Sequence, residues 1–205
     1  MNKAITEGIT FQPPAFASGL DVWSSGDGTP GADSYDQAVN AAFVPADADF
    51  GGALEIQKTQ STTKLRYTGE TPILPGVYLQ VRARVKALSG TLPSVRIAAW
   101  AGGAGGAQVP GVVQVGPTPA LQTYGSVVEV RAIIGTGQRG GGDMPWGPDA
   151  LYAHVGLDLT GDNGGIVRID DIEITDVSRV FLGDRIGPVD VLDYGAIGDG
   201  VTDDR

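Results

Sequence analysis

The chain has 205 residues, 41% of them hydrophobic, so it is long enough for one ordinary domain and too apolar to be disordered. Its formal net charge of −10 argues against nucleic acid and anionic membranes as main partners. The absence of cysteine and the single histidine, His154, exclude disulfides, thiolate chemistry and multi-histidine metal sites. Because no apolar run reaches the roughly 18 residues that a bilayer requires, we expect no membrane insertion.

Residues 1–19 are the first segment in chain order. They contain Pro13, Pro14 and Gly19, which favours an extended arm over a helix or a sheet strand. We expect this arm to contact another protein. It has no continuous apolar stretch of the kind found in secretory signals, which predicts a protein made in the cytoplasm.

A β-sandwich domain is expected over residues 20–177. Residues 20–23 are the first predicted strand, whereas residues 36–44 have a weakly helical composition. The 32 glycines and 13 prolines favour short strands joined by turns. Farther along, apolar and polar residues alternate, as is typical of strands with one buried face. The alternating segments are residues 53–58, 64–67, 77–87, 95–100, 127–134, 152–160 and 166–175.

Turns and loops separate these segments. Pro75-Gly76 and Ser89-Gly90 form tight turns around the clearest strand, and residues 161–164 form a hairpin turn. Two long loops rich in glycine and proline cover residues 101–123 and 135–150. Eight or nine short alternating strands predict an antiparallel β-sandwich, and a jelly roll is the favoured topology.

The order of these segments between Phe50 and Val177 carries a resemblance. The runs GGALEIQ, LPGVYLQVRARVKALSG, TYGSVVEVRAIIG and VGLDLTGDNGGIVRIDDIEITDV resemble carbohydrate-binding jelly-roll modules with a galactose-binding-like fold. Those modules often end in an Ile-Asp-Asp strand, as Ile169-Asp170-Asp171 does here. The resemblance implies recognition of a polysaccharide or another glycan without catalysis.

Asp170 and Asp171 interrupt an alternation, because Ile169 and Ile172 must both face inward. This shift predicts a β-bulge. In the resembling modules an acidic residue at this place helps to hold a structural calcium ion. The resemblance therefore implies Ca²⁺ at Asp171, with Asp170 as the adjacent alternative, and oxygen ligands suit this ion. The alternative is a solvated bulge that only twists the strand.

Trp146 is the first candidate for sugar binding. It lies between Pro145 and Gly147 in a long loop, near Arg139 and Asp143. Proteins bind sugars by stacking aromatic rings on them and by hydrogen-bonding their hydroxyl groups. These three residues therefore predict a carbohydrate site. The alternative is a ring that folds back over an edge of the sandwich.

Trp100 is the second candidate, because strand alternation places it on the outward side with Arg96. His154 also points outward, and Tyr124 is expected to flank one of the long loops, whereas Trp23 is expected in the core. If they shared one sheet, seven outward residues would form a mixed charged face suited to an acidic polysaccharide: Arg82, Arg84, Arg96, Glu129, Arg131, His154 and Asp158. The alternatives are a solvated face with weak ion pairs and a trimer contact.

The last stretch, residues 188–205, has the sequence PVDVLDYGAIGDGVTDDR and follows a linker at residues 178–187. A short apolar strand leads into the turn Gly198-Asp199-Gly200 and then into an acidic helix start. This run resembles the opening of the pectate-lyase-like right-handed parallel β-helix. That fold is shared by polysaccharide lyases, glycoside hydrolases and spike proteins of phages and phage-like gene-transfer particles. In that family the catalytic carboxylates lie on later coils, so no catalytic residue is predicted in this chain.

Together the two resemblances predict a non-catalytic carbohydrate-recognition module of a spike-like attachment protein, acting on capsular polysaccharide. One alternative is a structural anchor that joins a β-helix spike to a virion-like particle through the N-terminal arm. Another is an accessory module of a polysaccharide lyase or hydrolase. The β-helix resemblance also implies a homotrimer, and we expect the protein to act extracellularly or on a released particle.

Overall fold

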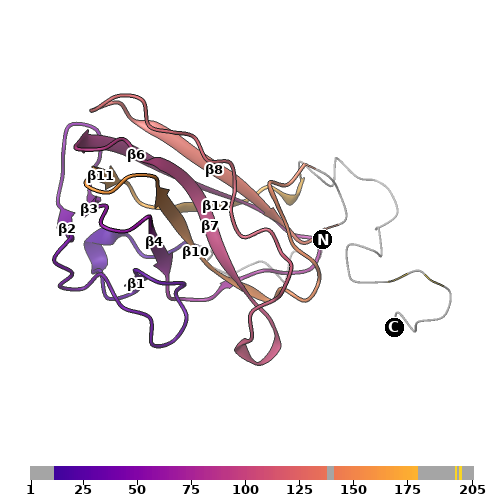
Figure 1. Ribbon diagram of the computed structural model, residues 1–205. Coiled ribbons are helices and arrows are strands. Elements are labelled where there is room, and N and C mark those ends of the chain that lie inside the picture. The colour runs from indigo at the N-terminus through magenta and orange to yellow at the C-terminus, as the bar shows by residue number, and fades with distance from the viewer. Residues whose placement is uncertain (1–11, 138–140, 180–196, 198, 200–205) are drawn as a thin grey trace.

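The computed structural model describes residues 12–137, 141–179, 197 and 199. Figure 1 shows two β-sheets packed as layers, with β6 and β8 in one and β4 and β10 in the other. Two short 3₁₀ turns, η1 (Phe16–Ser18) and η2 (Ala104–Gly106), lie in the described part of the chain. No helix in these residues is long and apolar enough to cross a bilayer.

The first layer, sheet A, is organised around β10 (Tyr152–Thr160). β7 (Ser94–Gly102) pairs with one edge of β10, and β4 (Thr62–Tyr67) and β5 (Thr71–Pro72) pair with the other. β1 (Trp23–Ser24) pairs with β4. Residues 108–121 lie along the outer edge of β7, through backbone hydrogen bonds such as those joining Ala99 to Gln114 and Gly116 to Ile97. This segment covers an edge that would otherwise expose unpaired backbone groups.

The second layer, sheet B, is organised around β6 (Tyr78–Ser89). β8 (Val128–Gly135) pairs with one edge of β6, while β11 (Ile166–Ile169) and β12 (Glu173–Asp176) share the other. β3 (Ala53–Gln57) and β2 (Ala41–Val44) continue the sheet beyond β11, and β9 (Met144–Pro145) pairs with β8. Consecutive strands such as β6 and β7 lie in different sheets, which is the connectivity of a sandwich.

The core lies between the sheets and follows the predicted alternation. In β6, Leu79, Val81 and Val85 are buried, while Arg82 and Arg84 are exposed. The alternation in β7, β8 and β10 likewise sends one set of apolar side chains into the shared core. The predicted all-β sandwich is therefore confirmed for the described residues.

The described part of the predicted arm, residues 12–19, packs against the sandwich. Phe16 is 1% exposed, and its ring lies 4.7 Å from that of Trp23 in the core. The Gln12 side chain accepts a hydrogen bond from the Ile174 backbone N–H at 3.2 Å and donates one to the Ile174 carbonyl at 2.5 Å. These residues thus belong to the folded domain.

Two predictions about local structure had different outcomes. The weakly helical composition of residues 36–44 was misleading, because the chain turns there, with Gln37 at a positive φ of 58°, and then pairs as β2 with β3. The predicted bulge is confirmed, because residues 170–172 lie opposite only Ala83 and Arg84 between β11 and β12.

The linker from residue 180 onward and the predicted β-helix opening lie outside the described residues, except for Ile197 and Asp199.

Candidate functional site

The loop site predicted around Trp146 is not formed as expected. Trp146 is 3% exposed, belongs to the core and donates its indole N–H to the Val113 carbonyl at 2.7 Å. The exposed position predicted for its ring is therefore wrong, and the ring folds back over the sandwich. Asp143 is exposed, but its Oδ2 accepts the backbone N–H of Ile133 at 2.8 Å and so ties the loop to β8. Arg139 lies outside the described residues.

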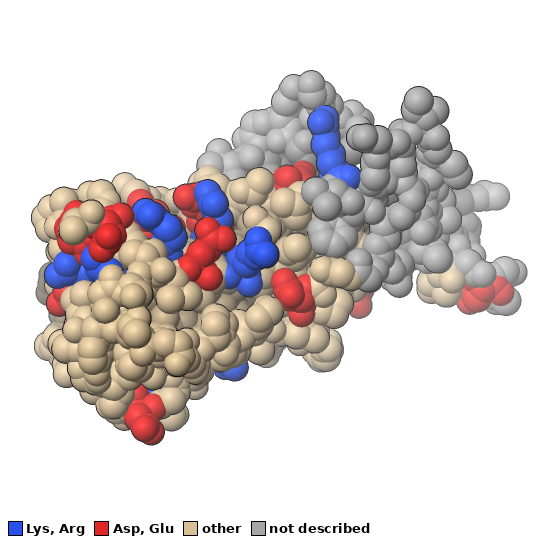
Figure 2. Space-filling model, turned by 90° about the horizontal axis from the view of Figure 1, so that it is seen from above, with Lys and Arg blue, Asp and Glu red and all other residues tan. Residues whose placement is uncertain are grey.

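The outer face of sheet B carries many charged side chains, and Figure 2 shows acids and bases alternating in a band across it. Asp47 joins two of the bases, at 2.6 Å from Lys86 and 2.9 Å from Arg168. The hydrogen bond from Lys86 is the main cause that holds the pKa of Asp47 below its usual value, and Arg168 and the N–H groups of Asp49 and Phe50 add to it. These charges are largely neutralised by one another.

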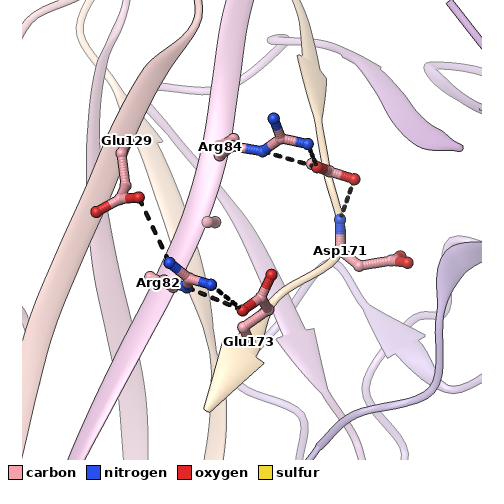
Figure 3. A pocket seen from close by; sticks show the side chains of 7 residues that line it. Arg82, Arg84, Glu129, Asp171 and Glu173 are labelled. Carbon is pink, nitrogen blue, oxygen red and sulfur yellow. Dashed lines mark hydrogen bonds and ion pairs between the residues drawn. The ribbon is translucent and has the colours of Figure 1, made fainter. Parts of the chain in front are cut away.

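A pocket of about 290 Å³ opens on this face where the bulge separates β11 from β12. Figure 3 shows Arg82 and Arg84 each turned toward a carboxylate. Arg82 donates to Glu173 through Nε at 2.9 Å, and Arg84 donates to Asp170 through Nε at 3.0 Å. Four carboxylates and two guanidinium groups line the pocket, and no aromatic ring does. It lacks the stacking surface that sugar sites use.

Asp171 points away from both arginines in Figure 3. Its Oδ1 accepts the backbone N–H of Phe16 at 2.9 Å, which links the bulge to η1. Burial raises the pKa of Asp171, against the lowering effect of the Phe16 N–H, and Asp170 and Glu173 raise it further. Among the described residues no three His, Asp or Glu side chains are grouped to hold a metal ion. Calcium at this place stays a prediction.

The outer face of sheet A gathers a different set of side chains. Register pairs Trp100 with His154 across β7 and β10, and it pairs Arg96 with Asp158. On the other edge of β10, Asp158 pairs with Lys64 of β4. Since directly paired residues project to the same side of a sheet, one face carries residues from three strands. These residues are Lys64, Arg66, Arg96, Trp100, Tyr152, His154 and Asp158.

Aromatic rings form one end of this face. The Trp100 ring lies 5.4 Å from His154 and 6.1 Å from Tyr152. Tyr152 lies over Gly102, where an added Cβ would come within 2.1 Å of the ring, so only glycine leaves room for it. Tyr152 is partly exposed, whereas Trp100 is 7% and His154 is 2% exposed. The two buried rings therefore support Tyr152, which offers the accessible aromatic surface.

Charged groups form the other end. Asp158 receives Nη2 of Arg66 on Oδ1 at 2.7 Å and Nε of Arg96 on Oδ2 at 3.0 Å. The Asp158 and Arg66 side chains are 3% and 5% exposed, and that of Arg96 is 26% exposed. Lys64 and Asp27 form a more exposed pair beside them, at 2.6 Å. Buried charges must be paired inside the protein, and Asp158 is the carboxylate that pairs with both arginines.

The predicted candidates divide between the two faces. Trp100, Arg96, His154 and Asp158 come together on sheet A. The single mixed charged face is wrong, because the other four charged residues named for it lie on sheet B: Arg82, Arg84, Glu129 and Arg131. Tyr124 is 53% exposed but lies beside the end of β6, bridged to Ala87, and does not join the sheet A group.

Sequence reasoning missed Tyr152, Lys64, Arg66 and Asp27 as members of this face. Tyr152 could have been found, because it shares the parity of His154 and Asp158 on the same predicted strand. Arg66 could not, because its partner on β10 depends on which strands are neighbours. Alternation within one segment does not contain that information.

No protein-family model and no curated protein sequence matches this chain. Solved structures do. The CBM22-1 xylan-binding domain of Paenibacillus barcinonensis Xyn10C aligns with a TM-score of 0.55 and 12% identity, over 82% of this chain and 94% of that one. Another CBM22 xylan-binding domain aligns with a TM-score of 0.54 and 9% identity, over 84% and 97%.

A third match contains a catalytic module as well. It is the CBM22-1–GH10 pair of Clostridium thermocellum Xyn10B complexed with xylohexaose, with a TM-score of 0.52 and 12% identity. It covers 88% of this chain but 30% of that one. At these identities the matches establish the fold. The described domain has the β-sandwich jelly-roll architecture found in these carbohydrate-binding modules.

Proposed function

We propose that this chain is a carbohydrate-binding module that holds a glycan on the outer face of sheet A. The observation that carries the proposal is the joint presence on one face of a partly exposed aromatic ring, Tyr152, and partly exposed polar groups, Arg96 and Lys64. The fold shared with xylan-binding domains supports it. The pocket on sheet B is lined by ion pairs and offers no ring.

The proposed mechanism is recognition without bond making. A sugar ring stacks its C–H groups on Tyr152, which Trp100 and His154 hold in place from the side. Hydroxyl groups farther along the glycan bond to side chains at the charged end, where Arg96 and Lys64 are reachable from solvent. The internal pairing of Arg66 with Asp158 keeps that end rigid, which limits the ordering that binding requires.

Isothermal titration calorimetry with a panel of soluble polysaccharides tests this function. Tyr152→Ala is expected to weaken binding by about tenfold or more, the scale of a central tyrosine in an interface. Tyr124→Ala is the matched control, since Tyr124 is an exposed tyrosine away from the face. Equal affinity of Tyr152→Ala and wild type, with both folded, would refute the site.

We further propose that the module serves a spike-like attachment protein and binds capsular polysaccharide, as a homotrimer. This finer proposal is supported by the similarity of residues 188–205 to a β-helix opening. Capsule pull-downs and light scattering of the full-length protein test it. Capsule binding by a trimer is the expected result. Binding to plant-type polymers alone favours the accessory-module alternative, and no binding to any glycan favours the anchor.

A further inference from the structure

We propose that the charged end of the sheet A face binds a carboxylate group of an acidic glycan, and that Arg96 determines this specificity. The inference rests on the proposed function, because it names the class of glycan for the same face. It follows from which hydrogen-bonding groups remain free there and from their charge.

Acceptors at this end are already used. Asp158 has one oxygen occupied by Arg66 at 2.7 Å and the other by Arg96 at 3.0 Å, and its side chain is 3% exposed. Asp27 is held by Lys64 at 2.6 Å. A sugar hydroxyl that approaches as a donor therefore meets carboxylates that are committed to cations.

Donors, in contrast, are left over. Arg96 uses only Nε, so among the described residues both of its terminal nitrogens are without a partner, on a side chain that is 26% exposed. Arg66 uses both terminal nitrogens, but its Nε is buried without a hydrogen-bond partner. The free end of the Arg96 guanidinium is a planar fork, the geometry that matches a carboxylate with two parallel hydrogen bonds.

The local charge points the same way. Arg66 and Arg96 share the single carboxylate of Asp158, and the neighbouring pair of Lys64 and Asp27 is neutral. This end of the face therefore carries an excess positive charge in a chain whose net charge is −10. A neutral glycan leaves that charge unpaired, whereas a carboxylate neutralises it.

Spacing along β7 separates the fork from the rings. Arg96 and Trp100 are four residues apart on the same side of the strand, and a strand rises about 3.3 Å per residue, so about 13 Å separates their attachment points. Tyr152 lies beyond Trp100, over Gly102. The ligand that reaches both ends is a chain of sugars, with a neutral ring on Tyr152 and an acidic ring at Arg96.

The test uses polysaccharides in matched pairs: glucuronoxylan, polygalacturonate and hyaluronan, each beside its carboxyl-reduced form. Wild type is compared with Arg96→Gln, Arg96→Lys and the control Arg131→Gln. Arg131 is an exposed arginine on the outer face of sheet B, so its loss changes the net charge equally without touching the sheet A face. Thermal melts establish that each variant is folded.

The expected result is that at least one acidic polymer binds about tenfold or more tightly than its reduced form, and that raised ionic strength shrinks the difference. Arg96→Gln removes the preference, Arg96→Lys restores part of it, and Arg131→Gln retains it. Equal binding of acidic and reduced polymers overturns this inference and leaves the proposed function standing. Failure of folded wild type to bind any polymer overturns both.

Discussion

Arg66 and Arg96 both form ion pairs with the buried carboxylate of Asp158. Substitution of Asp158 is therefore expected to lower the unfolding free energy. Asp158→Asn leaves the Arg66 guanidinium buried at 5% side-chain exposure without its counter-charge. Removing one partner of a buried pair costs about 3–5 kcal/mol of unfolding free energy. We expect that loss in chemical denaturation. Glu129→Gln, in a pair exposed at 45% on both sides, is expected to cost less than about 1 kcal/mol. Similar losses in both variants would contradict the assignment.

The lowered pKa of Asp47 predicts that the stability of the domain falls at acidic pH. Its pKa lies below the usual value because Lys86 donates to it and because Arg168 and backbone N–H groups stabilise the charged form, against some opposition from burial. A carboxylate with a depressed folded-state pKa contributes stability that is present above its unfolded pKa, near about 3.9, and is lost as the pH falls below that value. Melting temperatures measured across the acidic range should therefore fall steeply in wild type. Asp47→Asn should have a lower melting temperature at neutral pH and a shallower fall. Parallel curves would show that Asp47 does not control the transition.

Substitution of Asp171 tests whether the bulge binds calcium or has only a structural role. Because burial raises its pKa, its charge opposes folding at neutral pH, and this opposition fades as the pH falls and the group is protonated. Asp171→Asn keeps an oxygen to accept the Phe16 N–H, so with a chelator present we expect an equal or higher melting temperature. We propose that Ca²⁺ raises the melting temperature of wild type and leaves Asp171→Asn unchanged. If neither calcium nor a chelator changes the melting temperature of wild type, the proposal of a calcium site is refuted.

At the scale of elements, alternation predicted where the strands lie in the sequence but not which strands pair with one another in a sheet. The eleven-residue pattern at 77–87 corresponds to β6, because every second side chain there is apolar and most of the others are polar or charged. Alternation does not show to which of the two sheets a strand belongs. The hypothesis of one charged face placed Arg82 of β6 with Arg96 of β7, but the two residues lie on different sheets. Trp146 was misplaced for a related reason. Its indole partner, the Val113 carbonyl, lies on a segment whose course along β7 has no local signal.

The η1 turn is an element that composition alone did not assign to the domain. Two prolines and a glycine indicate an extended arm, yet Phe16 fills the core beside Trp23. Phe16→Ala is therefore expected to lower the unfolding free energy by about 3–5 kcal/mol, the cost of emptying a buried aromatic site. Ser18→Ala is the control, since Ser18 is exposed in the same turn. If guanidinium titrations gave Phe16→Ala the same unfolding free energy as wild type, residues 12–19 would not contribute to the stability of the domain.

At the scale of the whole molecule, the sandwich followed from composition and period, whereas the assembled face did not. Glycine and proline content, strand lengths and turn residues all favour antiparallel sheets, and these signals agree with one another. The face on sheet A depends instead on long-range pairing of β4, β7 and β10. Tyr152 also needs Gly102 opposite it, a relation that spans two strands distant in sequence.

The contact between Gln12 and Ile174 has a consequence for how this domain can be joined to others. The chain enters and leaves the sandwich at neighbouring points, tied by two hydrogen bonds. A domain with adjacent entry and exit can be spliced into a surface loop of a host protein without stretching either partner. It then projects from the host as a side branch, and tension along the host backbone bypasses the two sheets. The outer face of sheet A would keep its shape while the protein that carries it is pulled.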